Sequence, residues 1–243
     1  MSSVLQVTNL HKTFGHGDIF RDVTFSVNRG ETLGLFGPSG CGKSTLGRCI
    51  LGLEKLTSGT IFFQGRNIST LRRKERPHFQ IKMQMIFQHP EISFDPRRRL
   101  LYSITEPLVF HEKRNPDDVL NTLMPLLHAV GLHPDLLSKY PGQLSGGELQ
   151  RAMMVRIYSL SPQLVVADEP TSMLDMSVQA QILNLMKELQ ENNHTACIFI
   201  SHDPEIMQIM CDRVGVMSEG GCTIMTKNEF SEWIRPLLVD HSK

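Results

Sequence analysis

Residues 37–45 read GPSGCGKST, a combination of residue types that can bind a chain of phosphates. They follow the apolar run TLGLF (32–36) and precede the periodic segment LGRCILGL (46–53), which is the strand–loop–helix context that the GxxxxGK[ST] pattern requires. The glycines allow backbone N–H groups to crowd around phosphates, Lys43 adds a mobile positive charge, and the Ser44 hydroxyl can bind Mg²⁺. We expect these residues to bind nucleotide: Gly37, Pro38, Ser39, Gly40, Cys41, Gly42, Lys43, Ser44 and Thr45.

A second segment, LVVADEP (164–170), supplies two adjacent carboxylates at the end of an apolar run. The four apolar residues predict a buried strand, so Asp168 should emerge at its end, where it can hold Mg²⁺. Glu169 should point in a different direction and reach a water molecule. A carboxylate beside the terminal phosphate can orient and deprotonate that water.

Two further polar residues follow apolar runs, and one aromatic residue lies ahead of the phosphate loop. Gln88 follows MQMIF and His202 follows CIFI, which places both at the carboxyl ends of expected strands, the edge where open α/β sheets bind ligands. We expect both to contact the terminal phosphate, Mg²⁺ or the water. Phe14 can stack on adenine. Because no NKxD pattern for reading guanine occurs, the sequence favours ATP.

The segment LSGGELQR (144–151) indicates a second anion site. Ser145, Gly146 and Gly147 precede a helical pattern, and a helix N-terminus with free N–H groups can hold an anion. Since the phosphate loop already supplies one such site, one chain carries two.

Short β-type runs and helical periodicities should position these residues. The expected strands are 4–9, 23–27, 32–36, 60–64, 81–87, 164–168 and 196–200, and the expected helices include 175–192 and 204–211. The pattern turns helical from Leu100 to about Lys139. We therefore predict one α/β domain in which residues 1–88 and 161–243 form the core with a β subdomain, and about 89–160 form a helical insertion.

The composition excludes several classes of protein. Lys and Arg total 25, as do Asp and Glu, so no global basic field indicates nucleic-acid binding. The five cysteines show no metal-ligand spacing. The N-terminus does not have a signal-peptide pattern, and no stretch approaches the length of a transmembrane helix, so any membrane connection is expected through a partner.

In order and spacing, these motifs resemble those of the ATPase subunits of ABC transporters, and the resemblance covers nearly the whole chain. It is carried by 37–45, Gln88, LSGGE (144–148), LVVADE (164–169), SMLD (172–175) and His202. It implies a P-loop NTPase core with an antiparallel β subdomain and an inserted helical subdomain. Glu148 stands where the family usually has Gln, and Met173 where Ala is common; we expect neither to touch a phosphate contact.

The resemblance also implies how the two anion sites are used. Two such domains pair head to tail, and each ATP lies between the phosphate loop of one domain and the LSGG segment of the other. Ser145, Gly146 and Gly147 would then bind the γ-phosphate across the interface, and Asp175 would link the two sites. ATP would hold the pair together, and its hydrolysis would release it.

Three longer segments look like the peptide/nickel importer branch: FQHPEISFDPR (87–97), KYPGQLSGGELQR (139–151) and LDMSVQAQILNLMKELQ (174–190). This implies transmembrane permease subunits, a second ATPase subunit that is a sister or a copy, and indirectly an extracytoplasmic binding protein, with the chain peripheral on the cytoplasmic face of the membrane. Residues 89–115, including Arg97–Arg99, are the expected permease contact. The implied cargo is nickel or a metal chelate, or peptides. No cysteine cluster follows His202 in the manner of many peptide importers, which favours nickel or metal-chelate import, or a short subunit of the peptide branch, without deciding between them.

Three alternatives remain open at this point. A soluble ABC ATPase of DNA maintenance would carry a long coiled coil before the LSGG segment, and no sustained heptads occur here. An exporter ATPase would use the same motifs. A non-hydrolysing binding module is disfavoured by Glu169 and His202.

Overall fold

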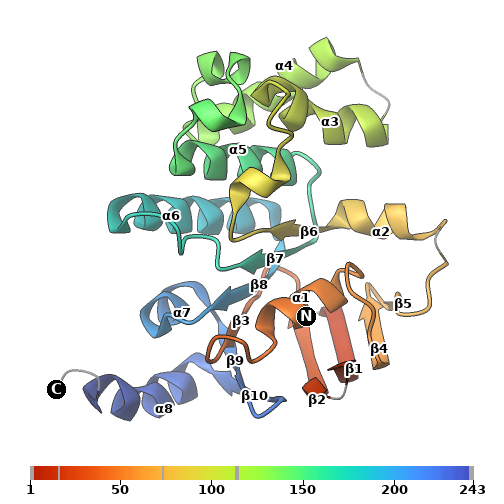
Figure 1. Cartoon of the computed structure of the whole chain (residues 1–243), viewed down its shortest axis with the longest axis vertical. Coiled ribbons are helices and arrows are strands. Elements are labelled where there is room, and N and C mark those ends of the chain that lie inside the picture. The colour runs from red at the N-terminus through yellow and green to blue at the C-terminus, as the bar shows by residue number, and fades with distance from the viewer. Residues whose placement is uncertain (1–2, 16, 73, 113–114, 241–243) are drawn as a thin grey trace.

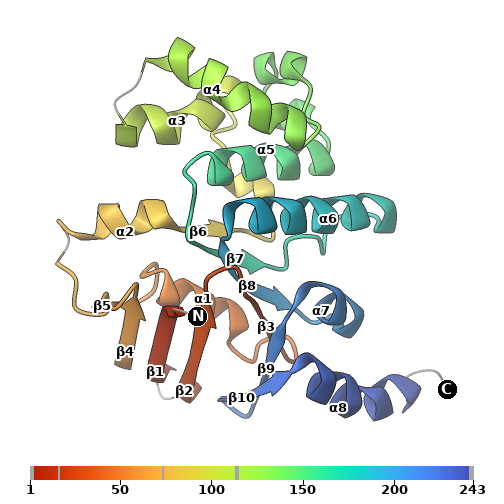
Figure 2. The same ribbon diagram turned by 180° about the vertical axis from the view of Figure 1, so that it is seen from behind.

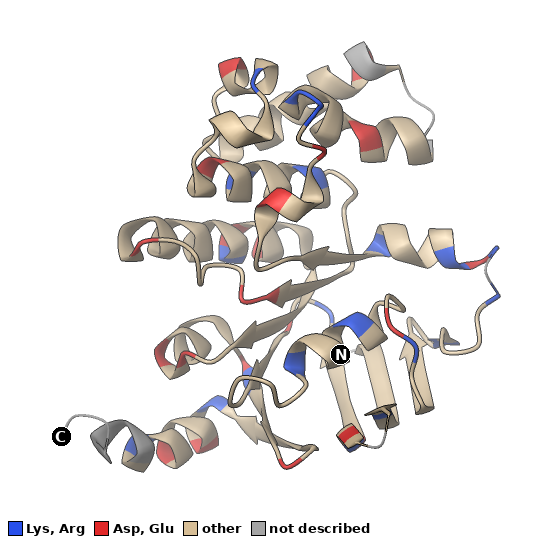
Figure 3. Cartoon of the chain, viewed as in Figure 1, with Lys and Arg blue, Asp and Glu red and all other residues tan. Residues whose placement is uncertain are grey.

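The computed structural model describes residues 3–15, 17–72, 74–112 and 115–240. Within them the chain forms two β-sheets and a set of helices (Figure 1). Both signs of charge are spread over all parts of the ribbon (Figure 3). No helix among the described residues is both long enough and apolar enough to span a bilayer.

The larger sheet has six strands in the order β10-β9-β3-β8-β7-β6. All neighbours pair in parallel except β10, which runs antiparallel to β9 at one edge. The strands are β3 Thr32–Phe36, β6 Met83–Ile86, β7 Leu164–Asp168, β8 Ala196–Ser201, β9 Arg213–Ser218 and β10 Gly221–Thr226. Because parallel neighbours end at the same edge, their following loops lie together.

The central strands of this sheet are buried on both faces. Every residue of β7 and β8 is buried. Val165 and Phe199 contribute to one hydrophobic cluster, whereas Val166 and Ile198 contribute to another. The two clusters are the two faces of the sheet, since neighbouring side chains along a strand point in opposite directions. This explains why the strands were recognisable as nearly continuous apolar runs.

The smaller, antiparallel sheet has the order β2-β1-β4-β5. Its strands are β1 Ser3–Phe14, β2 Gly17–Asn28, β4 Ser58–Phe63 and β5 Arg66–Asn67. Its apolar side chains share a cluster with helix α1 (Lys43–Ile50) and with one face of the larger sheet. The helix that follows the phosphate loop is therefore held between the two sheets (Figure 1).

Helices cover the opposite face of the larger sheet (Figure 2). The crossover helices are α6 Met176–Asn193 and α7 Pro204–Met210, close to their expected positions, and α8 Lys227–Asp240 follows β10. Between β6 and β7 the described residues form no strand, and their helices are η1 Pro90–Ser93, α3 Leu100–Glu112, α4 Pro116–Ala129, η2 Pro134–Ser138, η3 Pro141–Gln143 and α5 Gly146–Tyr158. Their buried residues are continuous with the cluster beneath α6 and α7, so this helical region shares the core.

Two details differ from the sequence-based expectation. Residues 81–82, expected in a strand, end helix α2 (Arg76–Lys82), and the strand begins at Met83. The apolar periodicity was interpreted as one extended run because two residues are too few to reveal a change of period. Strands β9 and β10 and helix α8 were not predicted.

Candidate functional site

Strand pairing brings the predicted nucleotide-binding residues to one edge of the larger sheet. Phe36, the last residue of β3, pairs with Ser201, the last residue of β8. Asp168 at the end of β7 pairs with Ile200, and Ile86 at the end of β6 pairs with Ala167. The segments that follow these strands carry the phosphate loop, His202, Glu169 and Gln88, so four parts of the chain meet at a single edge.

The phosphate loop has the backbone conformation that only glycine adopts easily. Gly40 and Gly42 have φ angles of +82° and +99°. A Cβ atom at Gly42 would lie 2.8 Å from Cγ2 of Ile19 in β2, so a larger residue would collide with the sheet beneath it. Gly42 also precedes α1 without any side-chain cap. The first N–H groups of α1 therefore have no capping side chain and can donate to a phosphate.

Lys43 lies across this loop. Its Nζ donates to the carbonyl oxygens of Gly37 at 2.7 Å and Pro38 at 2.9 Å, and the residue is 6% exposed. Carbonyl oxygens can hold the ammonium group without neutralising it. The positive charge therefore remains available to a phosphate chain seated in the loop.

The next residue, Ser44, contacts the first of the two predicted carboxylates. Its Oγ donates to Oδ1 of Asp168 over 2.7 Å, although the two residues are far apart in the sequence. Asp168 is 5% exposed, and burial raises its pKa above the ordinary value, while the hydrogen bond from Ser44 opposes that rise. A buried carboxylate of this kind is costly to keep charged and gains from a nearby cation.

The residues fit a magnesium ion that is shared with a substrate. Mg²⁺ prefers oxygen ligands and is usually held by one or two carboxylates together with substrate phosphates. Ser44 and Asp168 supply a hydroxyl and a carboxylate side by side. In the described part of the chain, no group of three or more His, Cys, Asp or Glu side chains is arranged to hold a metal. The pair therefore suits a metal ion whose remaining ligands come from phosphate oxygens, water and further side chains.

Glu169 turns away from Asp168 because its backbone is left-handed, with φ at +45°. Its N–H donates to the carbonyl oxygen of Ile200, which fixes the turn against β8. The two carboxylate oxygens have different partners: Oε2 lies 3.3 Å from Nε2 of Gln88, and Oε1 lies 3.1 Å from Nδ1 of His202. Three predicted residues from three separate segments thus form one cluster.

Ser172 belongs to the same cluster and was not singled out in the sequence. Its Oγ accepts from Nε2 of Gln88 at 3.3 Å and donates to the backbone carbonyl of Glu169 at 3.1 Å. No local pattern marks a serine for this role; its position three residues after Glu169 becomes meaningful only once the turn is known.

The LSGG segment begins helix α5, with Ser145 as its N-cap. Gly147 packs closely against α6, where an added Cβ would lie 2.9 Å from Cγ1 of Val178. In both ribbon views α6 and the strands of the larger sheet lie between α5 and α1 (Figures 1 and 2). Ser145, Gly146 and Gly147 therefore belong to a different part of the molecule from the phosphate loop.

The expectation that Glu148 would not touch a phosphate contact is wrong. Oε2 of Glu148 accepts from the Ser145 N–H at 2.7 Å and from the Ser145 hydroxyl at 2.9 Å. Glu148 N–H in turn donates to Ser145 Oγ at 3.3 Å. This is a capping box, whose sequence signature is Ser followed three residues later by Glu. The signature is therefore visible in the sequence at Ser145 and Glu148.

Phe14 and Asp175 lie outside the Glu169 cluster. Phe14 ends β1 and is 51% exposed, with Nζ of Lys12 lying 4.1 Å from its ring centroid. One ring face is thus available to a planar group. Asp175 caps α6 by accepting from the N–H of Val178 at 3.0 Å.

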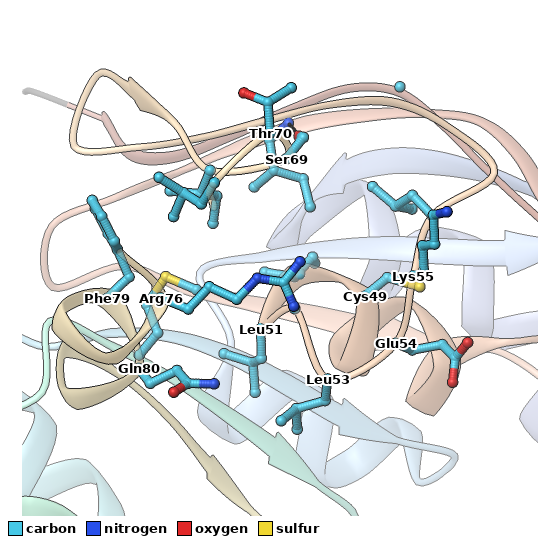
Figure 4. A pocket seen from close by; sticks show the side chains of 18 of the residues that line it. Cys49, Leu51, Leu53, Glu54, Lys55, Ser69, Thr70, Arg76, Phe79 and Gln80 are labelled. Carbon is cyan, nitrogen blue, oxygen red and sulfur yellow. Dashed lines mark hydrogen bonds between the residues drawn. The ribbon is translucent and has the colours of Figure 1, made fainter. Parts of the chain in front are cut away.

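A cavity of about 480 Å³ lies beyond the carboxyl end of α1 (Figure 4). Leu51, Leu53, Arg76 and Phe79 are among the side chains that surround it, and none of the predicted site residues lines it. Its size alone does not connect it with the nucleotide site.

Comparison with known proteins gives one family for this architecture. A family described as "ABC transporter" matches residues 20–172. The oligopeptide transport ATP-binding proteins AppF and OppF of Bacillus subtilis are 46% and 42% identical to the chain. Each alignment covers 82% of this chain, with 60% of AppF and 66% of OppF. The chain thus spans somewhat less than two thirds of the length of these relatives.

Solved structures of similar fold cover the chain more completely. The cbiO1 protein of Clostridium perfringens, described as part of the ABC transporter complex cbiONQ, matches with a TM-score of 0.85 and 26% identity over 98% of this chain and 96% of that one. The ATP-binding cassette MJ0796, in a dimeric post-hydrolysis state bound to ADP and Pi, matches with a TM-score of 0.82 and 25% identity over 92% of this chain and 98% of that one.

Proposed function

The chain belongs to the ABC transporter family, and from this premise we propose that it is the ATP-hydrolysing subunit of an importer for peptides. The observation that carries the proposal is the meeting of Lys43, Ser44, Asp168 and Glu169 at one sheet edge. A phosphate-binding loop, a metal-binding pair and a carboxylate base are the parts that phosphoryl transfer to water requires.

Each residue then has a distinct task. Lys43 and the loop amides bind the phosphates, while Ser44, Asp168 and Gln88 hold the metal. Bound Mg²⁺ would neutralise charge on the phosphate oxygens. Glu169 orients the attacking water and accepts its proton, and His202 donates to the γ-phosphate. Gln88 and His202 support this assignment because both already contact the Glu169 carboxylate.

The LSGG segment serves the nucleotide of a second ATPase domain in this proposal. Ser145 lies in a different part of the molecule from the phosphate loop, so it suits contact with ATP bound to a partner. The dimeric state of the similar cassette MJ0796 supports pairing. Each hydrogen bond to a charged group contributes about 1.5–3 kcal/mol, so two contacts per site shift closure about a hundredfold or more. The second domain is a sister subunit or a copy of this chain.

The cargo is proposed from the relatives. AppF and OppF are named for oligopeptide transport, which favours peptides over the nickel or metal chelate towards which the sequence leaned. The described residues between β6 and β7 form short helices and no long coiled coil, and the DNA-maintenance alternative is not favoured. A permease and an external binding protein would select the peptide, and the chain would lie on the cytoplasmic face of the membrane.

A groove beside Gln88 is the proposed contact with the permease. It has a volume of about 580 Å³ and is bounded by β6, η1, α3 and α5. Ile92 and Phe110 both line it and are 66% and 76% exposed, so the groove presents two large apolar side chains together. Because η1 begins two residues after Gln88, a helix seated here could move the residue that contacts Glu169.

The neighbouring arginines extend this surface. Arg97 pairs with Asp95, and the guanidinium of Arg98 lies 4.6 Å from the ring centroid of Tyr102. They line a second hollow that shares Glu106 and Phe110 with the groove. We include Arg97–Arg99 in the permease contact on this basis.

Purification of the chain from membranes tests the proposal. Permease subunits should co-purify, and peptide-loaded binding protein should stimulate ATP hydrolysis by the assembly. Phe110→Asp should abolish co-purification while preserving ATP binding by the isolated chain. Ile209→Asp is the control, because Ile209 is an exposed apolar residue on α7, and this variant should still co-purify with the permease. Stimulation by a nickel chelate instead of peptides would overturn the proposed peptide cargo. Retention of the permease by Phe110→Asp would overturn the proposal that the groove is the permease contact.

A further inference from the structure

We propose that Glu148 is an internal competitor of the γ-phosphate for Ser145, and that it raises the ATP concentration needed to close the shared site. This inference rests on the proposed pairing of ATPase domains. It adds a residue that controls closure of the two domains around ATP. Different variants test the role of Glu148 and the pairing of the domains, so failure of one can be distinguished from failure of the other.

The competition follows from the number of protons on Ser145. The Ser145 hydroxyl has one proton, and that proton is donated to Oε2 of Glu148 over 2.9 Å. A hydroxyl that donates to this carboxylate cannot at the same time donate to a phosphate oxygen. The hydroxyl must therefore give up its hydrogen bond to Glu148 before Ser145 can bind the γ-phosphate as a donor.

The negative charge of Glu148 also opposes binding of the γ-phosphate. The hydrogen bonds from Ser145 lower the pKa of Glu148 below its ordinary value, so the side chain is a carboxylate at neutral pH. It thus places one anion at the N-terminus of α5, where the helix dipole and free N–H groups favour negative charge. An arriving phosphate meets a helix end that is already occupied by a like charge.

The two helix ends proposed to contact phosphate differ in this respect. Helix α1 begins with no side-chain cap and no acidic residue in its first turn. Helix α5 begins with both a capping box and Glu148 in its first turn. The phosphate loop is therefore ready for nucleotide, whereas the LSGG end must first be opened.

A second capping box in the chain has nearly identical geometry and serves as a matched control. Oε2 of Glu229 accepts from the N–H of Thr226 at 2.7 Å and from its hydroxyl at 2.8 Å. Glu229 N–H donates back to the Thr226 hydroxyl oxygen at 3.3 Å. This box begins α8, in a part of the chain for which no phosphate contact is proposed. The effect of losing a capping carboxylate on stability can thus be measured apart from any effect on phosphate binding.

The experiment compares Glu148→Gln with Glu229→Gln in the complete transporter. Gln keeps an acceptor for Ser145 but removes the charge, and charge-assisted hydrogen bonds are roughly twice as strong as neutral ones. We expect Glu148→Gln to lower the ATP concentration for half-maximal hydrolysis about fivefold, with the maximal rate unchanged within about twofold. Glu229→Gln should leave both quantities as in the wild type, although both variants alter the melting temperature similarly.

Two further variants distinguish failure of the inference about Glu148 from failure of the shared site. Glu148→Ala should also lower the ATP midpoint, despite a lower melting temperature, because it too frees Ser145. An unchanged midpoint in Glu148→Gln, or a raised one in Glu148→Ala, would show that Glu148 only supports the helix and would overturn the inference. Ser145→Arg should abolish hydrolysis in the same assembly. If it does so while Glu148→Gln behaves as wild type, only the inference fails; if Ser145→Arg hydrolyses normally, the shared site fails as well.

Discussion

Nδ1 of His202 lies 3.1 Å from Oε1 of Glu169, across the gap between the ends of β8 and β7. This contact holds the carboxylate in one orientation. With Gln88 on the other carboxylate oxygen, Glu169 is held from both sides. In its proposed role as the base, a carboxylate held in this way does not need to reorganise during the reaction.

The first prediction concerns this carboxylate. Glu169→Gln should retain ATP binding, lower turnover by about 10²–10⁴-fold, and accumulate a closed pair of domains, because an amide cannot accept the proton from water. ATP affinity, turnover and size-exclusion elution with Mg-ATP would check this. Glu219→Gln is the control, since Glu219 is another glutamate with a left-handed backbone. Undiminished hydrolysis in Glu169→Gln would remove this residue from its role.

The second prediction concerns the shared site. Ser145→Arg should leave nucleotide binding by the isolated chain unchanged, because the phosphate loop is elsewhere in the molecule. It should block hydrolysis in the assembly, since a large side chain would fill the space of the γ-phosphate. Thr226→Arg disrupts the matched capping box on α8 and should leave the hydrolysis rate close to the wild-type rate. Equal rates in the two variants would contradict the model of two domains around each nucleotide.

The third prediction concerns the buried Asp168. Because burial raises its pKa, the charged form destabilises the chain when no cation is bound. Asp168→Asn should raise the melting temperature without nucleotide by roughly 2–4 °C, the effect of about 1 kcal/mol in a domain of this size. The amide oxygen can still accept from Ser44. The same variant should gain less stabilisation from Mg-ATP, which differential scanning calorimetry would measure. A melting temperature below that of the wild type without nucleotide would contradict the conclusion that the buried charge is destabilising.

The fourth prediction concerns the cysteines. Burial raises the pKa of Cys49 to about 11 and those of Cys197 and Cys222 to about 12, so their thiolate fractions at neutral pH are small. Cys41 is partly exposed in the phosphate loop. N-ethylmaleimide should therefore modify Cys41 first, and Mg-ATP should protect it. Peptide mapping by mass spectrometry would check the order, and Cys41→Ala should still bind ATP. Earlier labelling of Cys222 would contradict the assignment.

Several parts of the site were evident in the sequence because their signals are local. The phosphate loop at 37–45 combines glycines, a lysine and a serine between a strand and a helix, and glycine at positions 40 and 42 allows the positive φ angles that the loop adopts. The apolar run before Asp168 likewise predicts a buried strand without knowledge of its partners. The capping box at Ser145 and Glu148 is equally local, because Ser followed three residues later by Glu is its sequence signature.

Tertiary structure decided which of these residues meet. The pairing of Phe36 with Ser201 and of Asp168 with Ile200 joins strands that are remote in the sequence, and their register places His202 against Glu169 and Ser44 against Asp168. Nothing local fixes such a register, because it depends on how both faces of the sheet are packed. The sequence by itself determined the chemical groups and the turns that present them, whereas long-range strand pairing determined their distances, on which the chemistry depends.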